Sequence, residues 1–140
     1  IDKRLKPMQR VVTISNKYLS KAYSYKILKN KKVINDIFGA DKIVLFHKSG
    51  TASALDKRYI SDSKDVGSTA VFSAVIEGKV LEFYYDKTEG IKDKKTNSVW
   101  NIFGESVSGK LKGKELTQIV HADHFWFSWV AFKPDTIVYK

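Results

Sequence analysis

The chain has 140 residues, a length typical of one domain with a hydrophobic core of its own. Hydrophobic residues make up 43% of it and charged residues 29%, which is the composition of a globular chain and not of a disordered one. The absence of cysteine excludes disulfides and thiolate metal sites, and the longest strongly apolar run, residues 125–132, is far shorter than the roughly 20 residues of a membrane-spanning helix.

The net charge of +10 lies entirely in the first half of the chain. Residues 1–64 contain 15 Lys and Arg and five Asp and Glu, whereas residues 65–140 contain ten of each. A basic patch is one way to bind nucleic acid or another anionic polymer. A solvated, solubilising face explains the same charge without spatial clustering, so nucleic acid is not the expected partner.

We expect a single domain over residues 1–140, with residues 1–9 as a flexible N-terminal segment. The chain begins at Ile1 with no methionine and no apolar signal region. Any signal or anchor sequence is therefore expected to have preceded Ile1.

The first half of the chain is predicted to contain several strands and one short helix. β-branched residues predict a strand over Arg10–Ile14. Ser24 and Asn30 are the residue types expected at the start and the end of a short helix. The other predicted elements are strands at 32–35, 42–46 and 51–55, a Phe38-Gly39 turn, and a polar loop at 61–68.

The clearest local signal is a hairpin over Thr69–Tyr85. Two apolar, strand-length runs flank the pair Glu77-Gly78, and glycine tolerates the positive φ that a tight hairpin turn requires. The first run is apolar on both faces, so we expect it to be the more central strand. The hairpin as a whole is expected at the centre of the fold.

The last third is predicted to alternate turns and short elements. We expect residues 86–95 to be exposed because they are highly charged. Apolar residues at helical spacing favour a short helix over Phe125–Phe132, with Asp123 near its N-cap and Pro134 after its end. The remaining predicted strands are 98–103, 116–120 and 136–139.

Together these elements predict a mainly β or α+β domain. It would be built from an antiparallel sheet, or a small barrel-like sandwich, with two short helices. Four aromatic residues near the C-terminus, Phe125, Trp126, Trp129 and Phe132, are expected to pack in the core.

Several ordered motifs resemble one prokaryotic family, the domain of unknown function 3179. The most specific blocks are DVGST from Asp65, GKVLEF from Gly78, DKKTNSVW from Asp93, GKLKG from Gly109 and HFWFSW from His124. The first half resembles the family more weakly, through residues such as Ala22-Tyr23 and Gly39. The resemblance covers about residues 10–139.

This resemblance implies a fold and not an activity, because the family is one of unknown function. Many of its members look exported or lipid-anchored, which implies an extracytoplasmic or cell-surface location. Many also carry a cysteine-containing segment after the strand that corresponds to Ile43–Phe46. Here that segment, His47–Ser53, has no cysteine, so a thiol-based metal or redox role does not apply to this chain.

Four residues within the DKKTNSVW block are candidates for binding a ligand: Asp93, Thr96, Ser98 and Trp100. Their polar groups would line a pocket with the tryptophan at its floor, which suits a sugar or another small ligand. In the structural interpretation, Asp93 and Thr96 instead fix a turn by bonding to nearby backbone N–H groups, and Trp100 anchors that turn in the core.

Three histidines, His47, His121 and His124, are candidate ligands for copper or zinc. His121 and His124 are close in sequence, but His47 would have to converge on them through the fold. Their spacing is much looser than that of a metalloprotease motif, so a polar loop leading into an aromatic helix is the favoured explanation and metal binding the alternative.

No catalytic motif is present: G-x-S-x-G, G-x-G-x-x-G and the P-loop pattern are all missing. We therefore expect a non-catalytic, extracytoplasmic ligand-binding or structural module without a cofactor. The alternatives are a metal-binding protein that uses the histidines, and a protein that binds an anionic polymer or nucleic acid through its basic first half.

Overall fold

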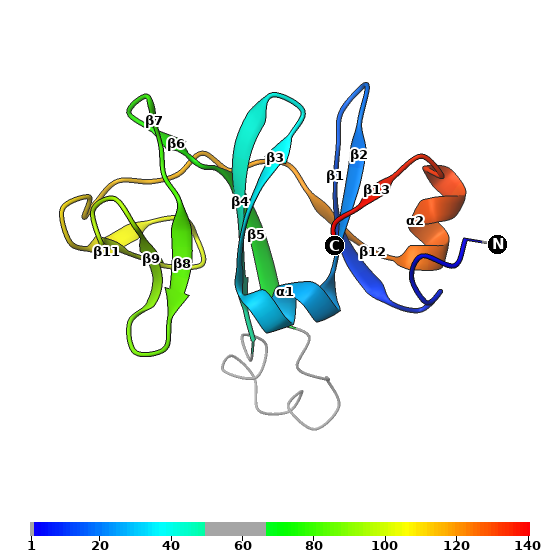
Figure 1. Cartoon of the computed structure of the whole chain (residues 1–140), viewed down its shortest axis with the longest axis horizontal. Coiled ribbons are helices and arrows are strands. Elements are labelled where there is room, and N and C mark those ends of the chain that lie inside the picture. The colour runs from blue at the N-terminus through cyan, green and yellow to red at the C-terminus, as the bar shows by residue number, and fades with distance from the viewer. Residues whose placement is uncertain (1, 50–66) are drawn as a thin grey trace. The chain divides into compact units, whose positions relative to one another are not determined.

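The computed structural model describes residues 2–49 and 67–140, and the predicted strand at 51–55 lies outside these residues. The chain forms two compact units, each with its own β-sheet structure (Figure 1). Each unit also has its own hydrophobic core. The first unit contains residues up to Ile27 together with Val120–Lys140, and the second contains Leu28–Ile119. The prediction of a mainly β protein with antiparallel sheets and two short helices is confirmed.

The first unit is one four-stranded sheet with a helix. Its strands lie in the order β12 (Ala122–Phe125), β1 (Arg10–Ser15), β2 (Ser20–Ser24) and β13 (Ile137–Val138). All neighbours are antiparallel except β13, which runs parallel to β2. The sheet therefore combines residues from both ends of the chain.

Helix α2 (Trp126–Phe132) follows β12 and buries two tryptophans against the sheet. Trp126 and Trp129 pack with Val11 and Ala22 to form the core of the first unit. The predicted helix is confirmed, but only two of the four aromatic residues are buried, since Phe125 is 41% and Phe132 72% exposed.

Asp123 lies near the N-cap of α2, as predicted, but its side chain does not cap the helix. The N-cap residue is Phe125, without a side-chain cap, and Asp123 lies within β12. The first N–H groups of the helix are satisfied by the N-terminal segment instead: Trp126 donates to the Gln9 carbonyl at 2.8 Å and Phe127 to the Pro7 carbonyl at 2.9 Å. A backbone carbonyl can thus replace the side-chain oxygen of a normal cap.

Helix α1 (Tyr25–Lys31) follows β2, and Ser24 caps it as predicted, because its Oγ accepts from the Ile27 N–H at 3.2 Å. Within the described parts of the chain, neither α1 nor α2 reaches the length or apolarity that crossing a bilayer demands.

The second unit contains three sheets. The first has the order β3 (Val33–Phe38), β4 (Asp41–Lys48) and β5 (Ser68–Ser73), with Gly39 in the predicted turn. The second has the order β11 (Ser106–Ser108), β10 (Val99–Trp100), β9 (Gly90–Asp93) and β8 (Phe83–Asp86). The third is the small hairpin of β6 (Val75–Ile76) and β7 (Lys79–Val80).

The predicted hairpin is correct at its turn and wrong in its length. Glu77 and Gly78 both have positive φ, 49° and 75°, as a two-residue hairpin turn of the type-I′ class requires. Only two residue pairs join β6 to β7, and the flanking strands take other partners: β5 pairs with β4, and β8 pairs with β9. The long apolar run is therefore divided between two sheets.

Two further predictions in this unit need correction. Residues 86–95 are not uniformly exposed, because they include β9, in which Ile91 is 8% exposed and Asp93 fully buried. Residues 116–120 form no strand: Gln118 makes an isolated bridge with Phe72, and Leu116 belongs to the core. The core is a row of aromatic contacts that runs from Phe72 through Phe46 and Phe83 to Trp100, with ring centroids 5.3–5.6 Å apart.

Candidate functional site: the Asp93 cluster and an adjoining pocket

The four candidate ligand residues lie together in the second unit, around the turn between β9 and β10. Asp93 ends β9 and Trp100 belongs to β10, so pairing of these strands brings them close together. The Asp93 carboxyl group accepts the Trp100 Nε1–H at 2.9 Å and the Thr96 backbone N–H at 2.6 Å. We call Asp93, Thr96, Ser98 and Trp100 the Asp93 cluster.

The hydroxyl groups of the Asp93 cluster form a directed chain of hydrogen bonds. The Leu111 N–H donates to Ser98 Oγ at 2.9 Å. Because the one proton of the Thr96 hydroxyl goes to Asp93, the Ser98 hydroxyl is the donor in its 2.6 Å bond to Thr96 Oγ1. The Thr96 hydroxyl then donates to Asp93 Oδ2 at 2.8 Å. A carboxylate only accepts hydrogen bonds, so Asp93 is a suitable end for this chain.

The cluster is tightly enclosed. Asp93 and Ser98 are fully buried and Trp100 is 3% exposed. Gly109, at φ +94°, lies so close that a Cβ there would stand 2.7 Å from Ser98 Cα, so no side chain fits at that position. The polar groups of these three cluster members are used within the protein, which favours the structural interpretation of their role.

Thr96 alone among the four also lines a pocket, which has a volume of about 390 Å³. The pocket walls come from β6, β7 and two turns. The lining residues are Ile76, Glu77, Lys79, Leu81, Lys95, Thr96, Lys110 and Leu111. Thr96 belongs to the Asp93 cluster, and the Leu111 N–H donates to Ser98 of that cluster, so the cluster positions one side of the pocket.

Three lysines from three separate segments surround this pocket: Lys79, Lys95 and Lys110. All three are exposed, and none of them forms an ion pair with another residue in 2–49 or 67–140. The single acidic lining residue, Glu77, is already paired with Lys114 at 3.4 Å. The pocket thus has a positive rim above apolar walls formed by Ile76, Leu81 and Leu111.

Sequence analysis did not find these lysines. Lys95 precedes Thr96 and Lys110 precedes Leu111, so both adjoin residues of the hydrogen-bonded chain. The position of these lysines next to Thr96 and Leu111 indicates a binding site only after the hydrogen bonds of the Asp93 cluster are known. An exposed lysine in a turn has the same appearance in the sequence whether or not it faces a pocket.

The three candidate metal ligands fall in different places. His47 is on β4 of the second unit, 3% exposed, with Nδ1 2.7 Å from Thr69 Oγ1. His121 and His124 belong to the first unit, where the His124 ring lies against Trp129 with centroids 4.7 Å apart. Across the part of the chain that the structure describes, no three histidine, aspartate or glutamate side chains are grouped as a metal site requires.

The comparisons with known proteins bear on the family alone. No curated protein and no solved structure matches the chain. The model of the family described as "Protein of unknown function (DUF3179)" matches residues 1–136, and the chain therefore belongs to this family.

Proposed function

We propose that this protein is a non-catalytic binding module whose ligand is a small anionic molecule with an apolar part. The observation that carries the proposal is the positive rim of Lys79, Lys95 and Lys110 around apolar walls. Three like charges close together repel one another, and a bound anion would relieve that repulsion. A volume of about 390 Å³ falls within the range of small-molecule pockets.

The buried neighbours of the pocket have a positioning role in this proposal. The Asp93 cluster fixes Thr96 and Leu111, and through the adjoining backbone it places Lys95 and Lys110 at the rim. Such support keeps a site in its binding geometry before the ligand arrives and so reduces the entropic cost of binding. The Thr96 side chain would contact the ligand directly.

The test uses 8-anilinonaphthalene-1-sulfonate, a fluorescent probe that combines an apolar ring system with one negative charge. The triple variant K79A/K95A/K110A should bind it about tenfold more weakly than wild type, because a loss of about 0.5 kcal/mol at each of three exposed charge contacts adds up to that factor. Binding to wild type should also weaken as salt concentration rises. Octanoate should compete with the probe.

The matched control is K26A/K29A/K87A, which removes three exposed lysines that do not line the pocket. This control should retain wild-type affinity. Equal losses in the two triple variants would show that the probe responds to net charge alone, and the proposal would be abandoned.

We also propose an extracytoplasmic or cell-surface location, which rests on the exported or lipid-anchored appearance of many members of the family that this chain resembles. Fractionation of the native host cells, with an antibody against the purified protein, is the measurement. Recovery of the protein in the cytosolic fraction would contradict this part of the proposal.

A further inference from the structure

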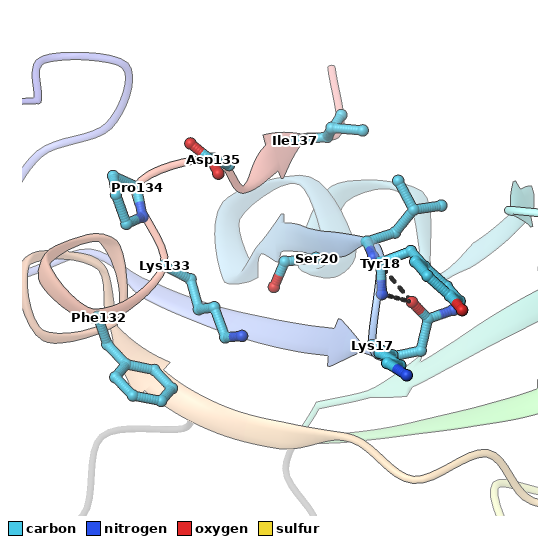
Figure 2. Close-up of a pocket in the computed structure, with 10 residues that line it drawn as sticks. Lys17, Tyr18, Ser20, Phe132, Lys133, Pro134, Asp135 and Ile137 are labelled. Carbon is cyan, nitrogen blue, oxygen red and sulfur yellow. Dashed lines mark hydrogen bonds between the residues drawn. The ribbon is translucent and has the colours of Figure 1, made fainter.

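A second pocket, of about 240 Å³, lies in the first unit, and its lining residues are shown in Figure 2. Two segments form it: the β1–β2 turn, Asn16–Ser20, and the segment that leads from the end of α2 into β13, Phe132–Ile137. Both segments are firmly held. The Asn16 side chain accepts the N–H groups of Tyr18 and Leu19 at 2.8 and 2.7 Å, which closes the turn.

The second segment is held by Thr136, which is 1% exposed. Its hydroxyl donates to the Lys133 carbonyl at 2.6 Å and accepts the Trp129 Nε1–H at 2.7 Å. The backbone of both walls is therefore fixed without any ligand, and such preorganisation is a property of binding sites.

Ser20 gives this pocket an unsatisfied donor. The residue is 8% exposed, and its Oγ has no hydrogen-bond partner among residues 2–49 and 67–140. A buried hydroxyl without a partner costs free energy, and most such groups are paired. In Figure 2 the Ser20 side chain points toward the same space as the ammonium group of Lys133.

The charges around the pocket favour an anion. Lys17 and Lys133 both line it, and each ammonium group lies over a neighbouring ring, at 5.9 Å from Tyr18 and 5.4 Å from Phe132. The one acidic lining residue, Asp135, turns its carboxylate away from the Lys133 ammonium group (Figure 2).

From these observations we infer that the pocket binds a small oxyanion, and specifically the carboxylate of a small organic acid. Ser20 Oγ–H would donate one hydrogen bond to it, and Lys133, with Lys17 further along the turn, would supply the positive charge. The Ser20 oxygen itself has almost no exposed surface, so the ligand would draw it out by rotation about the Cα–Cβ bond. The small volume restricts the ligand to a few carbon atoms.

This site is independent of the proposed function, because none of its residues belongs to the second unit. The test is a titration of isotope-labelled protein with acetate, and in a separate arm with inorganic phosphate, at constant ionic strength. Amide shifts of residues 16–20, 132–133 and 135–137 should move together and saturate. Saturation by acetate alone identifies a carboxylate site, and saturation by both anions identifies a general oxyanion site.

The variants S20A and K133Q should each weaken acetate binding at least threefold, whereas S128A, which removes an exposed serine of α2, should not. S20A should fold normally, because it removes a buried hydroxyl that has no partner. K79A/K95A/K110A should bind acetate as wild type does, so failure of the first proposal would leave this one intact. Absence of saturation below about 10 mM acetate, or unchanged binding in S20A, would overturn the inference.

Discussion

Asp93 shows how a single buried side chain determines the geometry around it. Its two carboxylate oxygens receive a backbone N–H, a hydroxyl and an indole N–H from residues within seven positions of it in the chain. Because all of these partners are donors, a carboxylate is the only common side chain that satisfies them all.

Replacing Asp93 by Asn should therefore destabilise the protein. One acceptor oxygen becomes an NH₂ group that faces the Trp100 or Thr96 donor, and the buried donor then loses its partner. We expect a cost of about 1–3 kcal/mol in the free energy of unfolding, measured by urea denaturation. D135N, at an exposed aspartate, is the control, and equal stability of D93N and wild type would contradict this account.

The hydroxyl group of Tyr25 makes the stability of the folded protein depend on pH. Burial, together with the hydrogen bond that its hydroxyl donates to Asp123 at 2.5 Å, raises the pKa of Tyr25 to about 12 from an ordinary value of 10.0. The folded state thus keeps the phenol protonated at pH values where the unfolded chain loses the proton. The difference between the two pKa values therefore contributes to the stability of the folded state. This contribution is complete below pH 10 and is lost as pH rises through about 12.

The variant Y25F removes this titration. Its urea midpoint should fall less steeply than that of wild type between pH 10 and pH 12. Y18F serves as the control because Tyr18 is 84% exposed, and it should follow the wild-type curve. Parallel curves for Y25F and wild type would show that Tyr25 does not titrate differently in the two states.

At the scale of elements, local patterns predicted single strands and turns well and strand partners poorly. The strand at Arg10, the capped helix after Ser24 and the Glu77-Gly78 turn depend on residues within a few positions of each other, and all three are confirmed. The choice of β4 as the partner of β5 depends on residues far apart in the chain, which no local pattern contains.

In the candidate site, too, the features that depend on neighbouring residues could be predicted, and those that depend on contacts between distant segments could not. The grouping of Asp93, Thr96, Ser98 and Trp100 could be predicted from the sequence because they lie within one turn and its flanking strands. It could not supply Lys79, which reaches the pocket from a separate hairpin, or the contact between Ser98 and Leu111. Contacts between elements decide where a pocket forms.

Asn35 is one such contact between elements. Its side-chain amide donates to the Phe83 carbonyl at 2.8 Å and accepts the Phe83 N–H at 2.9 Å. The amide therefore imitates a paired strand and joins β3 to β8, which are edge strands of different sheets.

The variant N35A should leave both backbone groups of Phe83 without these partners. We expect a loss of about 1–2 kcal/mol in the free energy of unfolding, measured by urea denaturation. N30A, at an exposed position late in α1, should change stability by less than about 0.5 kcal/mol. A loss in N30A as large as that in N35A would argue against a specific role for the Phe83 bonds.

At the scale of the whole molecule, the second unit is continuous in sequence and has a core of its own, which contains Phe46, Phe72, Phe83 and Trp100. We therefore expect the fragment 24–119 to fold alone and to give a dispersed amide spectrum, whereas the first unit needs both ends of the chain. The full chain provides the reference spectrum for residues 67–119. A collapsed spectrum would instead show that residues 1–140 fold as one cooperative domain.

The sheet order of the first unit also has a consequence during synthesis. Strands β1 and β2 leave the ribosome early, but β12 and β13, which flank them, are made only after the entire second unit. At typical elongation rates this interval is on the order of ten seconds. For that time the nascent β1–β2 ribbon has two open edges and no tryptophan cover, so chaperones that recognise unpaired strands should associate with it most strongly at this stage.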